Sequence, residues 1–168
     1  RLYLGAMLAA ILASSSATAD PLSDATIFIT ELSDRALAIM HNRTEPPPAR
    51  TLALKAIFLA VLDIDAMSRF ALGQFWSEAD DGLRRDYRHA YEDYVVRSLI
   101  ERLTSYRGET LRVTGAQPAD DKDIMVASMI VLSSDRSVRL EWRVRATPSG
   151  WRIVDLSLEG LSMARTQR

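Results

Sequence analysis

The sequence predicts an α+β fold, with a helical N-terminal half packed on one face of a roughly four-stranded antiparallel sheet. Up to about residue 107, apolar residues recur every three or four positions, as on one side of a helix. From about residue 109 they alternate, and turn-forming residues divide this half into strand-length pieces. We therefore expect the helices to cover one side of the sheet while the other side meets water.

Three helices are expected before the longest one. The first covers residues 24–40 and ends before the prolines at 46–48, which cannot continue a helix and predict an extended connector. The second covers residues 49–62. A short third helix, 65–73, closes at Gly73.

The fourth expected helix is the longest and begins after Ser77, a residue type suited to cap a helix N-terminus. Acidic residues in its first turn complement the helix dipole. Its apolar residues follow three- and four-residue steps and are Leu83, Tyr87, Tyr91, Tyr94, Val95, Leu99, Leu103 and Tyr106.

Four strands are expected at about 109–115, 124–133, 137–147 and 151–158. The third strand alternates most regularly, so its two faces differ in polarity. Its apolar face contains Val138, Leu140, Trp142 and Val144, and its polar face Arg139, Glu141, Arg143 and Arg145.

The orientation of Asp155 in the last strand depends on the strand register. One register pairs Arg145 with Arg152 across the preceding turn. Asp155 then shares the covered face with Ile153, whereas a slip of one residue turns Leu156 inward instead. The pattern leaves both registers open.

Residues 1–19 are interpreted as a secretory signal peptide, and residues 20–168 as one domain. An apolar run behind Arg1 ends with Ala17 and Ala19, which fit a signal-peptidase cut before Asp20. The run is shorter than the ~20 apolar residues of a membrane-spanning helix, although an uncleaved anchor stays open.

Composition and motifs argue against several functions. The 21 Lys and Arg residues nearly balance 22 Asp and Glu, which argues against a nucleic-acid partner. Cysteine is absent, and the motifs of common hydrolases, nucleotide-binding proteins and zinc proteases do not occur. The acidic residues Asp120, Asp121 and Asp123 are interpreted as a hairpin turn. We expect no catalytic residue, metal or cofactor.

Three motifs occur in a set order along the chain. They are Leu72-Gly73 with Trp76; then Trp151, Ile153 and Asp155; and then Glu159-Gly160-Leu161-Ser162. Over residues 49–168, this pattern resembles the MlaC family, also called toluene-tolerance proteins. The ending at residues 166–168, Thr-Gln-Arg, is similar to the hopanoid-associated branch of that family. The family continues into a final helix, so we expect this chain to be clipped at its C-terminal end.

The resemblance implies a non-enzymatic lipid carrier of the periplasm. Its fold would be related to the cystatin/NTF2-like group, with acyl chains in an apolar cavity between sheet and helices. Family members pass phospholipid between an outer-membrane lipoprotein complex and an inner-membrane ABC transporter with a substrate-binding ring protein. In the hopanoid branch, the cargo would be a hopanoid-type lipid.

The expected cavity-lining residues are apolar or aromatic and come from both halves of the chain. They are Ile57, Val61, Phe70, Tyr87, Tyr91, Tyr94, Met129, Leu140, Trp142 and Ile153. Two alternatives stay open. One is an NTF2-like enzyme with Asp155 as general base on a small apolar substrate, which requires Asp155 to face inward and be desolvated. The other is a periplasmic adaptor with a fully packed core.

Overall fold

The computed structural model describes residues 20–104, 110–133 and 136–163. The expectations for the signal peptide, for Tyr106 and for the ending at residues 166–168 lie outside the described residues. The helices are α1 (Pro21–His41), α2 (Pro47–Val61), α3 (Ile64–Leu72), α4 (Phe75–Glu78) and α5 (Asp81–Thr104).

The start of α2 corrects the expectation that all three prolines lie in an extended connector. Pro46 is extended, with φ −64° and ψ 150°, but Pro47 and Pro48 form the first turn of α2. The first turn of a helix has no partner for its N–H groups, so proline loses no hydrogen bond there and its fixed φ suits the helix.

The start of α5 corrects the expectation that Ser77 caps the long helix. The chain forms the short helix α4 first and then extends at Ala79. Asp80 Oδ1 accepts a hydrogen bond of 2.8 Å from the backbone N–H of Leu83, so Asp80 caps α5. Gly73 ends α3 with a φ of 59°, a positive value that favours glycine.

The sheet is antiparallel throughout, with the order β1-β2-β3-β4-β5. Its strands are β1 (Thr110–Pro118), β2 (Asp123–Ser133), β3 (Arg136–Thr147), β4 (Gly150–Leu158) and β5 (Leu161–Ser162). The four expected strands are therefore present, and the short β5 is an addition. Glu159 and Gly160 join β4 to β5 with φ values of 50° and 80°, as in the two-residue turns of β-hairpins.

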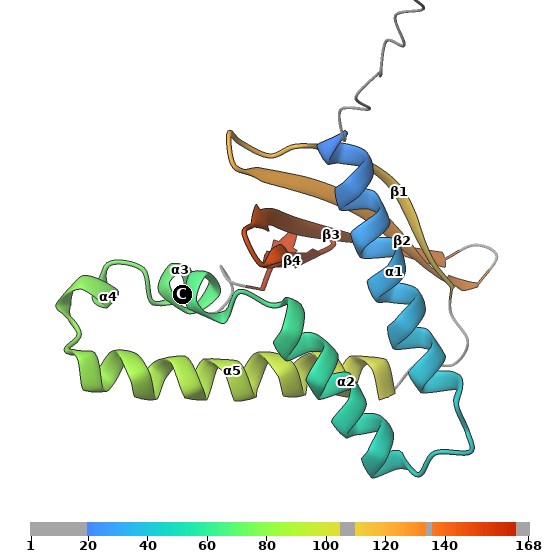
Figure 1. Cartoon of the computed structure of the whole chain (residues 1–168), viewed down its shortest axis with the longest axis horizontal. Coiled ribbons are helices and arrows are strands. Elements are labelled where there is room, and N and C mark those ends of the chain that lie inside the picture. The colour runs from blue at the N-terminus through green and yellow to red at the C-terminus, as the bar shows by residue number, and fades with distance from the viewer. Residues whose placement is uncertain (1–19, 105–109, 134–135, 164–168) are drawn as a thin grey trace, which may run out of the picture.

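The helices and the sheet form two layers. Figure 1 shows α1 lying over β1 and β2, while α4 and the first part of α5 extend beyond the sheet. The inner face of the sheet and the helices share one core, with Ile29, Leu54, Val95, Val126 and Val144 at its centre. This confirms the predicted α+β arrangement. None of the described helices combines the length and apolar character needed to cross a membrane.

A β-bulge at Val154 determines the orientation of Asp155. Arg145 pairs with Arg152, as in the first of the two open registers. The register then shifts by one residue, which places Asp155 opposite Arg143 on the outer face of the sheet.

Each of the two open registers therefore holds for part of β4. Ile153 lies opposite Val144 and is buried, as the first register predicts. Beyond the bulge, Leu156 lies opposite Trp142 and is also buried, as the second register predicts. The bulge lets both apolar residues face the helices while the carboxylate between them faces outward.

Candidate functional site

An apolar cavity of about 300 Å³ lies between the helical layer and the inner face of the sheet. Helices α1, α2 and α5 and strands β1 to β4 contribute to its wall. The lining residues are Leu32, Ser33, Ala36, Leu37, Phe58, Leu99, Arg102, Leu103, Leu111, Ile130, Leu132, Val138, Leu140, Trp142, Leu156 and Leu158.

The spacing of these residues follows from the geometry of the elements. Leu32 and Ala36 are four residues apart in α1 and therefore lie on one side of the helix. Val138, Leu140 and Trp142 alternate along β3 and therefore share one face of the sheet. Two periodicities in the sequence thus produce the two opposite walls of the cavity.

The polar groups of the cavity wall are bonded within the protein. Trp142 Nε1 donates to Ser128 Oγ at 2.9 Å, and Ser128 Oγ donates to the carbonyl of Leu140 at 3.1 Å. Ser33 Oγ donates to the carbonyl of Ile29 at 2.7 Å. Since these groups already have partners, the cavity favours an apolar occupant over water.

The cavity volume limits what it holds. A water-sized group takes up ~30 Å³, and a methylene group is of similar size, so the cavity accommodates about ten such groups. This corresponds to the inner part of one acyl chain.

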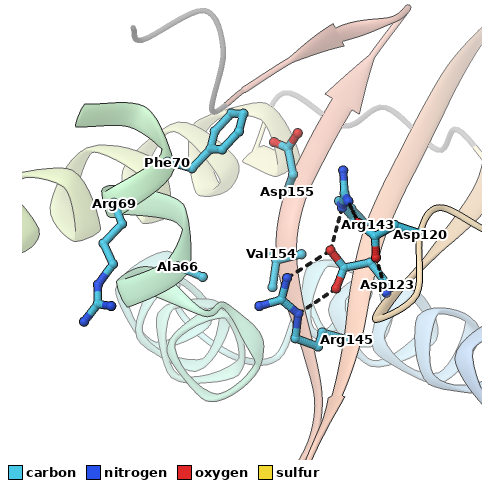
Figure 2. Close-up of a pocket in the computed structure, with 9 residues that line it drawn as sticks. All are labelled: Ala66, Arg69, Phe70, Asp120, Asp123, Arg143, Arg145, Val154 and Asp155. Atoms are coloured by element: carbon cyan, nitrogen blue, oxygen red, sulfur yellow. Dashed lines mark hydrogen bonds and ion pairs between the residues drawn. The ribbon is translucent and has the colours of Figure 1, made fainter. Parts of the chain in front are cut away.

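A second, polar groove lies on the other side of the sheet, between α3 and the outer face of β3 and β4. Its volume is about 540 Å³. In Figure 2, Phe70 of α3 and Asp155 of β4 point toward one another across this groove. Its wall contains Ala66, Arg69, Phe70, Asp120, Asp123, Arg143, Arg145, Val154 and Asp155.

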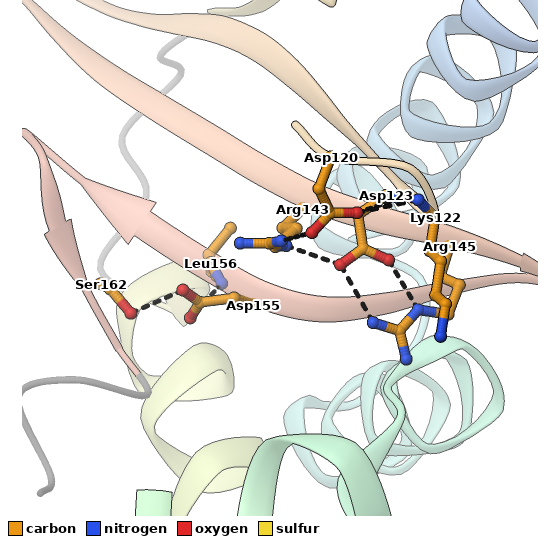
Figure 3. A network of polar contacts seen from close by, with 8 residues as sticks. All are labelled: Asp120, Lys122, Asp123, Arg143, Arg145, Asp155, Leu156 and Ser162. Atoms are coloured by element: carbon orange, nitrogen blue, oxygen red, sulfur yellow. Dashed lines mark hydrogen bonds and ion pairs between the residues drawn. The ribbon is translucent and has the colours of Figure 1, made fainter. Parts of the chain in front are cut away.

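Asp123 is the centre of a charge network beside this groove (Figure 3). Its carboxylate is only 2% exposed and accepts hydrogen bonds from Arg143 Nε at 2.7 Å and from Arg145 Nε at 2.6 Å. Burial alone would raise the pKa of Asp123, but the hydrogen bonds from Arg145 and Arg143 outweigh it and lower the pKa below its ordinary value. Asp123 therefore ties the turn before β2 to β3.

Asp120 has the turn role that the sequence predicts. Its Oδ1 accepts from the backbone N–H groups of Lys122 at 2.8 Å and Asp123 at 2.9 Å. Its other oxygen accepts from Arg143. These hydrogen bonds lower the pKa of Asp120, with the two backbone donors as the largest cause.

Asp155 lies outside the apolar cavity. Its Oδ1 accepts from the backbone N–H of Leu156 at 2.8 Å, and its Oδ2 accepts from Ser162 Oγ at 2.6 Å (Figure 3). The carboxylate is half-buried and faces the polar groove. The enzyme alternative required Asp155 to face the apolar interior, so that alternative loses its structural basis.

Comparison with known proteins adds to this geometry. The family model described as MlaC protein matches residues 30–168. The chain belongs to the MlaC family. A similar solved structure is the phospholipid-binding protein from Ralstonia solanacearum, in complex with a phospholipid. The match has a TM-score of 0.72 and 22% sequence identity, and covers 86% of this chain and 83% of that chain. The two proteins share a fold.

Each of the three MlaC-like motifs lies at a structural junction. Gly73 ends α3, and the guanidinium groups of Arg69 and Arg84 lie 5.3 and 5.8 Å from the centroid of the Trp76 ring. The second and third motifs meet in the hydrogen bond between Ser162 and Asp155. We interpret the motifs as parts that hold the fold.

The ten predicted cavity residues of this MlaC-family chain divide into three groups. Leu140 and Trp142 line the apolar cavity. Five others lie in the core or pack against it: Ile57, Val61, Tyr87, Tyr91 and Ile153. A role of these residues in binding a lipid stays a prediction.

Three predicted residues lie away from the cavity. Phe70 is 45% exposed in the polar groove, and Tyr94 is 49% exposed on α5, where the adjacent Val95 is the buried residue. Met129 pairs with Arg139 on the outer face, and its neighbour Ile130 lines the cavity. Periodicity placed both Tyr94 and Val95 on the apolar side of the helix, and the structure buries Val95. In β2, it is Ile130 that faces the cavity.

Sequence reasoning did not assign the second half of α1 and the end of α5 to the cavity. Leu32, Ala36, Leu99 and Leu103 all line it. The repeat of apolar residues identified the buried side of each helix. It did not reveal that these two helix segments lie over the same part of the sheet.

Tyr91 is an unusual part of the core beside these elements. Its side chain is 4% exposed, and its hydroxyl oxygen has no hydrogen-bond partner among the described residues. Burial is the largest cause that raises the pKa of Tyr91 far above its ordinary value. The ring centroid of Tyr87 lies 5.9 Å from that of Tyr91, so the two rings pack together in this part of the core.

Proposed function

We propose that this chain is a lipid-binding and transfer protein that holds an acyl chain of a phospholipid in its apolar cavity. The observation that carries the proposal is a cavity with internally bonded polar groups, located between the layers of an MlaC-family fold. The related protein from Ralstonia solanacearum, described as phospholipid-binding, supports the same class of cargo.

The energetics of lipid transfer explain why such a cavity is useful. Each methylene group moved from hydrocarbon into water costs ~0.8 kcal/mol, so a sixteen-carbon chain resists release by ~12 kcal/mol. A cavity for about ten carbons offsets ~8 kcal/mol of this cost. Only the remaining part of the chain then has to be covered outside the cavity.

The proposed setting is the periplasm. The apolar leader at residues 1–19, with a cut before Asp20, supports export. We propose that the protein is a soluble auxiliary component of an ABC-type lipid transport system. It would exchange lipid with an inner-membrane transporter complex that has a substrate-binding ring protein, and with an outer-membrane lipoprotein complex.

A hopanoid-type lipid is a second candidate cargo. It rests on the Thr-Gln-Arg ending at residues 166–168. A fused ring system is wider and stiffer than an acyl chain, so it would need a broader cavity than one acyl chain does. The described cavity, with room for about ten methylene-sized groups, favours the phospholipid.

Native mass spectrometry of the protein purified from a Gram-negative periplasm tests the proposal. We expect a stoichiometric phospholipid adduct, identified after extraction. Ala36 lines the cavity and is buried, whereas Ala38 is exposed on the same helix. Ala36→Phe should therefore reduce the bound lipid strongly, and Ala38→Phe should leave it unchanged.

Other outcomes have clear meanings. Adding a ring to a packed site costs ~1–3 kcal/mol, so a thermal melt must show that Ala36→Phe is folded. A lipid-free wild-type protein that takes up no phospholipid from vesicles would contradict the proposal and favour the packed adaptor. A hopanoid adduct in place of phospholipid would contradict the proposed cargo but would still support a lipid-carrier function.

A further inference from the structure

We propose that Arg102 binds the phosphate of the lipid at the rim of the apolar cavity. The inference rests on the proposed function and adds the chemical group that the protein recognises. It makes the site selective for acyl lipids that carry a phosphate over acyl lipids that carry no anionic group.

The first observation is the position of Arg102. It lies in the last turn of α5, between Leu99 and Leu103, and all three line the cavity. Arg102 is exposed while the two leucines are partly buried. An exposed residue that also lines a cavity lies at its rim, so the guanidinium is placed where an acyl chain would leave the protein.

The second observation is the charge of the wall. Among the described residues that line the cavity, Arg102 is the single charged residue, and no Asp or Glu is present. The cavity therefore presents an apolar interior with one cation at its edge.

This arrangement matches an anionic amphiphile. A guanidinium has five N–H donors in a planar fork, so it can bind two phosphate oxygens and keep other contacts at the same time. The dipole of α5 favours a cation in its last turn, which stabilises Arg102 at this position. The hydroxyl of Ser33 and the indole N–H of Trp142 already have partners in the protein, so neither competes for the phosphate.

A competition experiment tests the assignment. Delipidated protein is incubated with vesicles that contain equal amounts of phosphatidylglycerol and of diacylglycerol with the same chains, and the bound lipids are extracted. We expect wild type to be enriched in phosphatidylglycerol. Arg102→Gln should lower the ratio of bound phosphatidylglycerol to diacylglycerol about ten- to a hundredfold, the range for losing a charge-assisted hydrogen bond.

Two matched variants sharpen the readout. Arg97→Gln removes an exposed arginine from the same helix but away from the cavity, and it should keep the wild-type ratio. Arg102→Lys keeps the charge without the fork and should retain part of the selectivity.

The results separate this inference from the proposed function. If Arg102→Gln keeps the wild-type ratio, or loses both lipids equally, the phosphate assignment is overturned while lipid binding stands. A repeat with palmitate in place of phosphatidylglycerol distinguishes a carboxylate from a phosphate, and an effect confined to palmitate would overturn the phosphate. If wild type binds none of these lipids, the proposed function itself fails.

Discussion

The apolar cavity and the polar groove lie on opposite faces of one sheet and differ in chemistry. The polar groove is the larger, about 540 Å³ against about 300 Å³ for the apolar cavity. Three arginines and three aspartates line the groove, whereas the cavity is lined almost entirely by apolar side chains. The chemistry of the wall identifies the candidate lipid site here, and volume alone would have selected the other one.

The difference follows from the alternation of side chains along the strands. In β3, Leu140 and Trp142 face the helices, and Arg143 and Arg145 face outward. Outside, the charges are paired with one another through Asp123, so the groove is held together by its own ion pairs. Inside, the described polar groups of Ser33 and Trp142 are bonded within the protein, and the charged Arg102 lies at the rim.

The largest expected effect lies in the polar groove. Asp123→Ala leaves Arg143 and Arg145 without their shared, buried partner, and we expect it to lower the free energy of unfolding by ~3 kcal/mol. Asp121→Ala, in the same turn but exposed, should change it by less than ~0.5 kcal/mol. Urea unfolding measures both. Both variants should still bind phospholipid. If Asp123→Ala no longer bound it at temperatures where that variant is folded, the polar groove would contribute to lipid binding, contrary to the contrast drawn between the groove and the apolar cavity.

The same network predicts a pH dependence. The pKa of Asp123 is lower in the folded protein than its unfolded value of ~3.9. Its contribution to stability is therefore complete above that value and is lost as the pH falls toward the folded pKa. Between pH 5 and pH 3, wild type should lose more stability than Asp123→Asn. Equal losses in unfolding experiments across this range would show that Asp123 is not the titrating group.

The next effect concerns the wall of the apolar cavity. Ser128→Ala removes the acceptor of the Trp142 indole N–H and leaves that donor buried without a partner. We expect a loss of ~1–3 kcal/mol in the free energy of unfolding. Ser137→Ala, at an exposed position of β3, is the control and should be close to neutral. A neutral Ser128→Ala would indicate that water reaches the indole and that the cavity is wet.

The smallest expected effect has the opposite sign. Tyr91→Phe removes a buried hydroxyl that has no hydrogen-bond partner in the described part of the chain, so it should raise the free energy of unfolding by ~1 kcal/mol. Thermal and urea unfolding give the change directly. Destabilisation by Tyr91→Phe would mean that the hydroxyl has a partner, and that the core beside the cavity is more polar than described.

The sequence predicted the elements whose pattern is local. Alternation along β3 assigned Leu140 and Trp142 to the covered face, and the repeat in the long helix identified Val95 and Leu99 as part of its apolar side. The sequence could not predict the bulge at Val154, because either register of β4 buries apolar residues. The bulge lets each of the two registers hold for part of the strand, so Ile153 and Leu156 are both buried.

The periodicity of apolar residues was least informative about which residues form the apolar cavity. Periodicity identifies the apolar side of α1 but not the element that this side contacts, so the cavity residue Ala36 was not assigned to the site. The polar face of β3 was expected from its arginines, but pairing two of them with Asp123 requires the fold of the preceding turn. Phe70 was placed inside because its aromatic side chain suits a core, and the structure exposes it on α3 at the polar groove.

Lipids with brominated acyl chains test the central claim most directly, because bromine quenches tryptophan fluorescence only at close range. Trp142 lines the apolar cavity, whereas Trp76 belongs to α4 and its ring contacts the guanidinium groups of Arg69 and Arg84. With Trp76→Phe and Trp151→Phe, brominated phosphatidylglycerol should quench the remaining Trp142. With Trp142→Phe and Trp151→Phe, it should leave Trp76 unquenched. Quenching of Trp76 without quenching of Trp142 would place the acyl chain outside the cavity and contradict the account.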